Sequence, residues 1–149
     1  MSTQEMSGAE RRNGTQAVIE KLLEERKRLL VLYEQVAGVG PYADGLPSAD
    51  VVKEFSQLLV DYVAAGHFGL YERITEGQER RQRVVAVAQD VYGQIAATTD
   101  AAVNFNDTYD QSDQQGLTGA LAAQIPQLGE NLATRIELED RIIAELLAR

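Results

Sequence analysis

Apolar side chains recur at steps of three and four residues through most of this 149-residue chain. This spacing places them on one side of an α-helix, whereas a half-buried strand alternates at every second residue. In residues 15–36 the apolar stripe includes Ile19, Leu22 and Leu29, and Arg26 falls on the same stripe. No segment has the alternation of a strand. The sequence therefore predicts an all-α fold.

Glycine, proline and polar tracts divide the periodic segments from one another. We expect helices over residues 15–36, 48–66, 67–75, 79–105 and 117–148, and loops over residues 38–47 and 106–115. Ser48 suits the N-cap of the second helix, and Gly66 and Gly69 predict a kink or break at its end. Long helices with short links are typical of an antiparallel four-helix bundle, here with an additional short helix.

Length and composition predict one domain. Residues 15–149 are enough for a single helical bundle with its own core, and the polar residues 1–14 are expected to be a disordered lead. These first residues lack the apolar stretch of a secretory signal, and no apolar run reaches the roughly 20 residues that a membrane span needs. With no cysteine in the chain, we expect a cytoplasmic protein without membrane contact.

The formal net charge of −9 indicates the kind of partner. Nucleic-acid binding depends on lysine and arginine neutralising phosphates, so direct contact with nucleic acid is not expected. An acidic surface instead attracts basic proteins, although acidity also serves solubility alone.

Catalytic and metal-binding motifs are missing from the sequence. A nucleophile triad needs a partnered base, and His67 is the sole candidate in a chain without cysteine. A di-iron site of paired Glu-x-x-His motifs would need a second histidine. Phosphate-binding glycine motifs are also absent. We therefore expect no catalytic residue, no cofactor and no metal.

Charged residues on the apolar sides of helices predict a polar layer inside the bundle. Arg26 lies on the apolar stripe of the first helix, and Asp140 lies on that of the last. Buried charges are costly unless they are paired, so we expect Arg26, Asp140 and His67 to lie together, with Glu72 or Asp61 able to join. Two interpretations remain open, a structural network that sets helix register and a pocket for a partner.

A second candidate site lies on the middle segment. Asp61, Ala65, Phe68 and Glu72 follow one another at steps of four, three and four, so they form one stripe on a helix. An aromatic side chain with acids beside it suits the docking of a basic helix. The alternative is a solvated face with Phe68 turned inward.

Three blocks of the sequence are similar to one known family. Residues 61–72 read DYVAAGHFGLYE, residues 25–31 read ERKRLLV, and residues 132–143 read LATRIELEDRII. In this order and spacing they resemble the Rsd/AlgQ family, the regulators of sigma D. The resemblance implies a helical anti-sigma factor that sequesters the primary sigma factor of RNA polymerase, chiefly through sigma region 4 and possibly region 2.

The resemblance also assigns roles to individual residues. It implies that Asp61 faces an arginine of sigma region 4, and that His67, Phe68, Tyr71 and Glu72 complete the same signature. It further implies that Arg26, Glu139 and Asp140 belong to the flanking blocks. With His67 and Tyr71, these three residues are expected to form a buried polar cluster or pocket.

Two other functional classes stay open at this point. One is a helical regulator or scaffold whose His67 pocket binds a small molecule or peptide. The other is a small helical enzyme that uses Arg26 and Glu139, and converging arginines in a concave pocket would favour it.

Overall fold

Four long helices and two short π-helical turns make up the described part of the molecule. The computed structural model describes residues 8–38, 47–109, 113, 117 and 119–148. In chain order the elements are α1 (Gly8–Ala37), α2 (Ala49–Gly66), η2 (His67–Tyr71), η3 (Ile74–Gln78), α3 (Gln82–Tyr109) and α4 (Gly119–Leu147). No strand occurs in these ranges, and the predicted all-α fold is confirmed.

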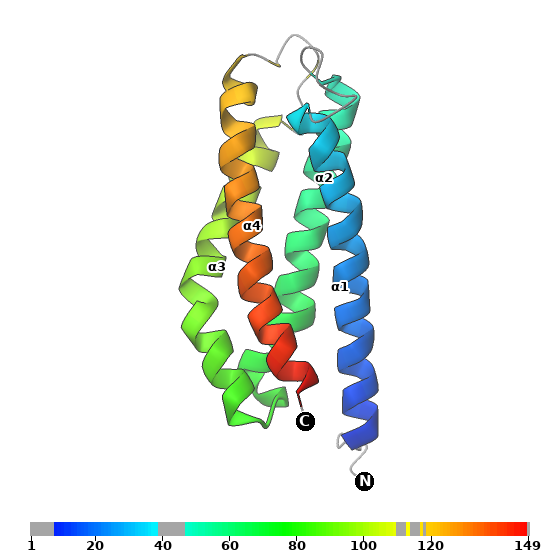
Figure 1. The fold of residues 1–149 in the computed structure, drawn as a ribbon, viewed down its shortest axis with the longest axis vertical. Helices are drawn as coiled ribbons and strands as arrows, with labels where there is room; N and C mark the ends of the chain where they lie inside the picture. The colour runs from blue at the N-terminus through cyan, green and yellow to red at the C-terminus, as the bar shows by residue number, and fades with distance from the viewer. Residues whose placement is uncertain (1–7, 39–46, 110–112, 114–116, 118, 149) are drawn as a thin grey trace.

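The helices run alternately up and down and form an antiparallel bundle (Figure 1). Helix α1 packs against α2, α2 against α3, α3 against α4, and α4 returns to lie beside α1. The N- and C-terminal ends therefore meet at the same end of the bundle. Within the described ranges, no helix has both the length and the apolarity that crossing a bilayer requires.

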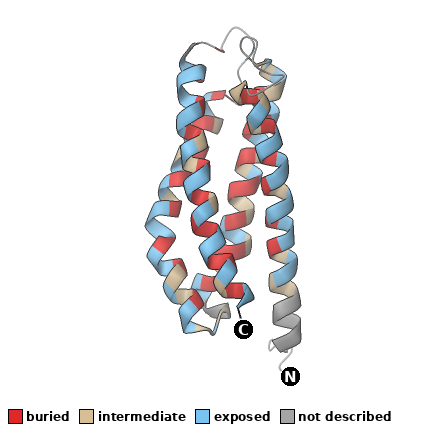
Figure 2. Ribbon diagram, viewed as in Figure 1, coloured by how far each residue is buried: buried red, intermediate tan, exposed pale blue. Residues whose placement is uncertain are grey.

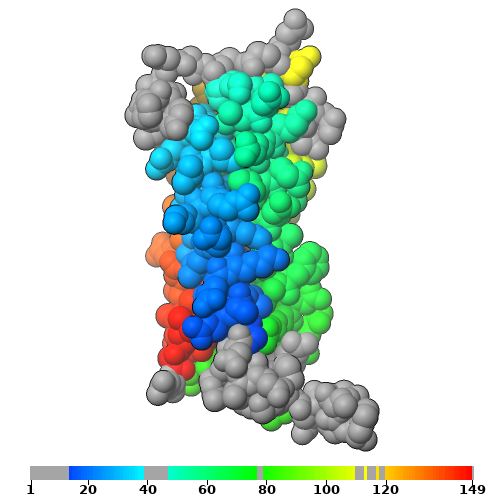
Figure 3. Space-filling model, turned by 90° about the vertical axis from the view of Figure 1, so that its right-hand side faces the viewer, coloured from blue at the N-terminus to red at the C-terminus, as the bar shows by residue number. Residues whose placement is uncertain are grey.

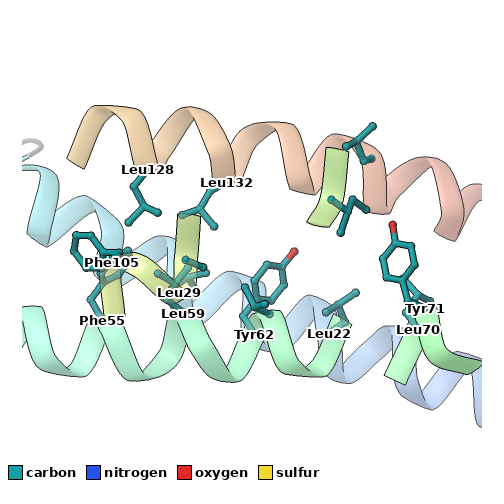
Figure 4. Packing of buried hydrophobic residues seen from close by; sticks show 14 of the residues in the cluster. Leu22, Leu29, Phe55, Leu59, Tyr62, Leu70, Tyr71, Phe105, Leu128 and Leu132 are labelled. Atoms are coloured by element: carbon teal, nitrogen blue, oxygen red, sulfur yellow. The ribbon is translucent and has the colours of Figure 1, made fainter. Parts of the chain in front are cut away.

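One hydrophobic core runs the length of the bundle. Buried residues line the inward sides of all four helices, and exposed residues cover their outer sides (Figure 2). Leu22 and Leu29 of α1, Phe55 and Leu59 of α2, and Leu128 and Leu132 of α4 meet in the interior (Figure 4). The spacing that predicted the helices thus also selects the side chains that pack between them.

Hydrogen bonds hold two helix ends in place, the start of α2 and the end of α4. Ser48 is the N-cap of α2, and its hydroxyl accepts a hydrogen bond from the Val51 N–H at 3.2 Å, as the sequence predicts. At the other end of the bundle, Arg81 Nη1 donates to the Leu146 carbonyl at 2.9 Å and Arg83 Nη2 donates to the Ala148 carbonyl at 2.7 Å. Cations suit this place because the last carbonyls of α4 carry partial negative charge.

Two predicted boundaries are wrong. Helix α1 begins at Gly8, so residues 8–14 of the expected disordered lead are helical, whereas residues 1–7 lie outside the described part. A helix already formed extends readily by one hydrogen bond per residue, without any apolar stripe. Helix α3 continues to Tyr109, past the expected loop start at residue 106. The reason is tertiary contact, because Asn106 bonds Ser56 of α2 and the buried Tyr109 donates to Gln124 of α4.

The rest of both predicted loops cannot be compared. Residues 39–46 of the loop at 38–47, and residues 110–112 and 114–116 of the loop at 106–115, lie outside the described part.

Candidate functional site

The carboxylate of Glu139 is the centre of a buried polar cluster. Its side chain is 0% exposed. It accepts hydrogen bonds from Arg26 Nη2 at 3.2 Å, from Arg135 Nε at 3.0 Å and from the Tyr62 hydroxyl. These donors come from α1, α4 and α2, so one carboxylate joins three helices. A buried carboxylate is tolerated here because its oxygens are occupied by charged and neutral donors.

Arg135 extends this cluster to the fourth helix. Its side chain is 1% exposed, and its Nη1 donates to the hydroxyls of Thr98 at 3.1 Å and Thr99 at 2.8 Å, both on α3. Its Nη2 lies 3.4 Å from the Val63 carbonyl of α2. The guanidinium therefore has a partner on each of its three nitrogens, and the cluster connects all four helices.

The cluster opens to solvent at Asp140. Arg26 Nη1 donates to Asp140 Oδ1 at 2.8 Å, and the Asp140 side chain is 55% exposed. The structure thus places Arg26 and Asp140 in contact, as predicted, but the prediction that Asp140 is buried is wrong, because its side chain lies at the solvent end of the cluster. Arg26 also donates through Nε to the Tyr62 hydroxyl at 3.1 Å. Two arginines face two acids, so the charges balance within the cluster.

Tyr71 lies beside this cluster without joining its hydrogen bonds. Its ring is buried, and its hydroxyl points from the α2 side of the bundle toward α4, as does that of Tyr62 (Figure 4). Among the described residues the Tyr71 hydroxyl has no hydrogen-bond partner. Burial raises the pKa of both phenols, and the negative charge of Glu139 raises the pKa further.

The prediction that His67 belongs to the buried cluster is wrong, because His67 is exposed. The helix geometry changes where η2 begins, so His67 and Tyr71 no longer share one face. In η2 the Glu72 N–H bonds the His67 carbonyl, five residues back, so one extra residue enters the turn. Gly66 and Tyr71 then face inward, and His67 turns outward. Neither Asp61 nor Glu72 makes a hydrogen bond to the cluster in the described part.

The outward side of the same segment carries Asp61 and Phe68 of the predicted acidic and aromatic stripe. Phe68 is 66% exposed, so it is not turned inward, and its ring packs edge-on against that of His67 with centroids 4.8 Å apart. Asp61 is exposed and accepts a hydrogen bond from Gln57 at 3.3 Å. Ala65 and Glu72 are half-buried. We call Asp61, Ala65, Phe68 and Glu72 the acidic–aromatic face.

Helix α1 borders this part of the molecule. Figure 3 shows α1 beside α2 and the turn that follows it. The contact is close because Gly69 has no side chain, and a Cβ there would lie 3.1 Å from a methyl group of Val18.

The comparisons with known proteins give one family. The family model described as "Regulator of RNA polymerase sigma(70) subunit, Rsd/AlgQ" matches residues 1–147. This chain belongs to the Rsd/AlgQ family. A "Regulator of sigma D" from Enterobacter sp. (strain 638) is 33% identical over 147 residues, which cover 97% of this chain and 88% of that protein.

Further relatives carry the same name. The "Regulator of sigma D" of Shigella dysenteriae serotype 1 (strain Sd197) is 31% identical over 144 residues, covering 93% of this chain and 89% of that protein. That of Escherichia coli (strain K12 / DH10B) has the same identity and coverage. No solved structure matches this chain.

The residues that carried the Rsd/AlgQ resemblance serve two different parts of the structure. Arg26, Tyr71, Glu139 and Asp140 lie in or beside the buried cluster, whereas His67 is on the surface near Phe68. The described residues include no group of three or more histidine, aspartate or glutamate side chains placed to hold a metal ion.

Arg135 and Tyr62 are the site residues that the sequence reasoning missed. Arg135 was detectable, because it lies three residues after Leu132 and four before Glu139 and so falls on the apolar side of its helix. Arg26 was included in the predicted polar layer for the same reason, because it lies on the apolar stripe of its helix. No sequence pattern indicated that the Tyr62 hydroxyl bonds Glu139.

Replacing Gly66 by alanine is expected to destabilise the protein by about 1–3 kcal/mol, although alanine is the better helix former. The new Cβ would lie 2.9 Å from Glu139 Oε2 and 3.2 Å from Arg135 Nη2, two atoms that their own bonds hold in place. The matched control is Gly93→Ala in α3, where no described atom lies within 4 Å of the Cβ. Gly93→Ala should stabilise by up to about 1 kcal/mol. Urea unfolding of both variants measures the change in the free energy of unfolding. If both substitutions change it in the same direction, the prediction is contradicted.

Alkaline pH is expected to unfold the protein through Tyr62 and Tyr71. Their pKa values are raised in the folded state, so both stay protonated while the unfolded chain loses these protons above about pH 10. Stability is therefore complete below that pH and falls as pH rises, by about 1.4 kcal/mol per tyrosine and pH unit. Tyr71→Phe should reduce the loss of stability per pH unit by the contribution of one tyrosine. It should leave the free energy of unfolding at neutral pH unchanged or higher. An unchanged slope in urea titrations above pH 10 would contradict the assignment.

Proposed function

We propose that this protein is an anti-sigma factor that binds the primary sigma factor of RNA polymerase and represses transcription initiation. The observation that carries the proposal is the match of residues 1–147 to a family of sigma(70) regulators. The relatives named as regulators of sigma D support the same partner. The net charge of −9 suits a basic protein surface.

The proposed contact is the acidic–aromatic face, with sigma region 4 as its main target and region 2 as a further one. Phe68 is an exposed aromatic side chain that a partner would cover, and aromatic anchors often supply most of the binding energy at protein interfaces. Asp61 lies seven residues earlier on the same stripe and would pair with an arginine of the partner. Two short π-helical turns follow, and such turns often occur at functional sites.

The proposed mechanism is occlusion. The face would cover a basic surface that sigma factor otherwise uses to contact DNA or polymerase. No bond is made or broken, so the protein is proposed not to be an enzyme and to need no cofactor or metal. It is proposed to act in the cytoplasm without touching nucleic acid or a membrane.

The buried cluster is proposed to position this face rather than to bind the partner. Tyr62 and Val63 of α2 and Gly66 at its end all contact the Arg135–Glu139 pair, and η2 follows directly. The cluster therefore sets the rotation of the segment that presents Asp61 and Phe68. The groove between α1 and α4 does not include His67, so it adds no support for a small-ligand pocket at that residue.

Calorimetric titration of the purified protein with full-length primary sigma factor tests the proposal. We expect a one-to-one complex whose affinity falls as salt increases, because the contact joins opposite charges. Absence of binding at low salt, where attraction is least screened, would reject the proposed partner. Binding without repression in a transcription assay would reject the proposed consequence.

A further inference from the structure

An open groove lies between α1 and α4, apart from the acidic–aromatic face. Its volume is about 650 Å³. Leu30 and Tyr33 of α1 line one side, and Leu132, Ala133 and Ile136 of α4 line the other. Leu30 is 37% exposed although it is a large apolar residue. The floor of the groove is thus apolar and accessible.

Two bridges between the helices bound this groove. At one end the Tyr33 hydroxyl donates to the Ile125 carbonyl at 3.1 Å, and Gly129 leaves room for the tyrosine ring. At the other end Arg26 pairs with Asp140 at 2.8 Å. Arg26 and Tyr33 are seven residues apart on α1, which corresponds to about 10 Å along the helix. That length matches two turns of a docked helix.

Two acids and one arginine line the rim, and Glu137 is the acid that makes no ion pair with a described residue. Glu137 and Asp140 line the groove, and Asp140 remains 55% exposed in spite of its bond to Arg26. Arg141 also lines it, but its guanidinium pairs with Asp90 of α3 at 3.2 Å. A second copy of this chain is a poor occupant, because each copy has a net charge of −9.

We propose that the α1–α4 groove binds an amphipathic helix of a partner protein that has lysine or arginine beside its apolar ridge. The apolar side chains would fill the space over Leu30, Ala133 and Ile136, and the cations would pair with Glu137 and Asp140. Helix-in-groove binding uses this combination of apolar anchors at helical spacing and charged edges. The site goes beyond the proposed function and does not depend on it.

A synthetic helix serves as the probe. It has about 18 residues, with leucines at positions i, i+3, i+4 and i+7 and lysines beside them, and a control peptide has the same composition in scrambled order. Fluorescence anisotropy should show binding of the helix, and at least about tenfold weaker binding of the scrambled control. Equal binding of both peptides would overturn the proposal, because charge alone would then explain it.

Variants that fill the groove locate the site. Ala133 and Ala144 line the groove and are exposed, so Ala133→Trp or Ala144→Trp should block it without disturbing the core. Each should weaken peptide binding at least about tenfold, whereas Ala123→Trp, on an exposed part of α4 outside the lining, should not. The urea midpoints of both groove variants should match that of the wild type, which shows that they fold normally. If such folded variants bind the peptide as tightly as the wild type, the groove is not the site.

Asp61→Arg separates this inference from the proposed function. The variant should bind the peptide like the wild type, because Asp61 is not part of the groove lining. A loss equal to that of Ala133→Trp would overturn the inference. The sigma-factor titration is a separate measurement, so failure to bind sigma factor rejects the proposed function and leaves the peptide result to decide the groove.

Discussion

Replacing Glu139 by glutamine is expected to destabilise the protein by about 3–5 kcal/mol. Glu139 is fully buried and is the acceptor shared by Arg26, Arg135 and Tyr62. Glutamine keeps the size of the side chain but removes its charge, so the buried Arg135 loses its one carboxylate partner. Small domains have a total stability of about 5–15 kcal/mol, so this change removes a large part of it.

Asp140→Asn is the matched control for this variant. Asp140 is the next residue on α4 and also pairs with Arg26, but its side chain is 55% exposed. Water can replace the lost partner there, so the change should destabilise by less than about 1 kcal/mol. Urea unfolding at neutral pH measures both variants. If both lose the same amount, burial of Glu139 is not what makes the cluster important.

Reversing the charge of Asp61 is expected to weaken binding to the primary sigma factor by at least about 100-fold, or roughly 3 kcal/mol. In the proposed complex Asp61 faces an arginine, so Asp61→Arg would place two like charges together. Asp61 is exposed and stands outside the buried cluster, so the variant should fold like the wild type. Asp61→Ala should weaken binding less, because it removes the attraction without adding repulsion.

Glu20→Arg provides the comparison at the same net charge. Glu20 is an exposed acid on α1, and replacing it by arginine changes the net charge by the same two units as Asp61→Arg. It should reduce binding only through the general field of the protein, an effect that salt largely screens. Titration of both variants with full-length primary sigma factor decides the matter. Equal losses would remove Asp61 from the contact and leave only general electrostatic attraction.

Phe68 lies on the short segment that links the buried cluster to the acidic–aromatic face. The ring is 66% exposed because the π-helical turn at residues 67–71 places it outward, while Leu70 and Tyr71 pack inward. A glycine precedes that turn at position 66, where the Arg135–Glu139 pair leaves no room for a side chain. The stability of the cluster and the display of the proposed contact thus depend on the same short segment.

The sequence by itself determined the helices and the pairing of Arg26 with Asp140. The spacing of three and four residues needs no tertiary information, since it follows from the 3.6-residue turn of an α-helix. The cost of an unpaired buried charge then indicated that Arg26 and Asp140 would meet. A chain with one histidine also lacks the second Glu-x-x-His motif that a paired di-iron site needs, whatever its fold.

Only the tertiary structure decided which way the middle segment faces. Helical spacing places His67 with Val63 and Tyr71, but one extra residue in the π-helical turn separates His67 from Tyr71, so Tyr71 faces inward while His67 lies on the surface. Gly66, the residue before that turn, packs against the Arg135–Glu139 pair of α4, which lies far away along the chain. Likewise, the groove between α1 and α4 lies beside two bridges that join those helices, Tyr33 to Ile125 and Arg26 to Asp140. Local spacing carries no information about such contacts, since they depend on residues that only the folded chain brings together.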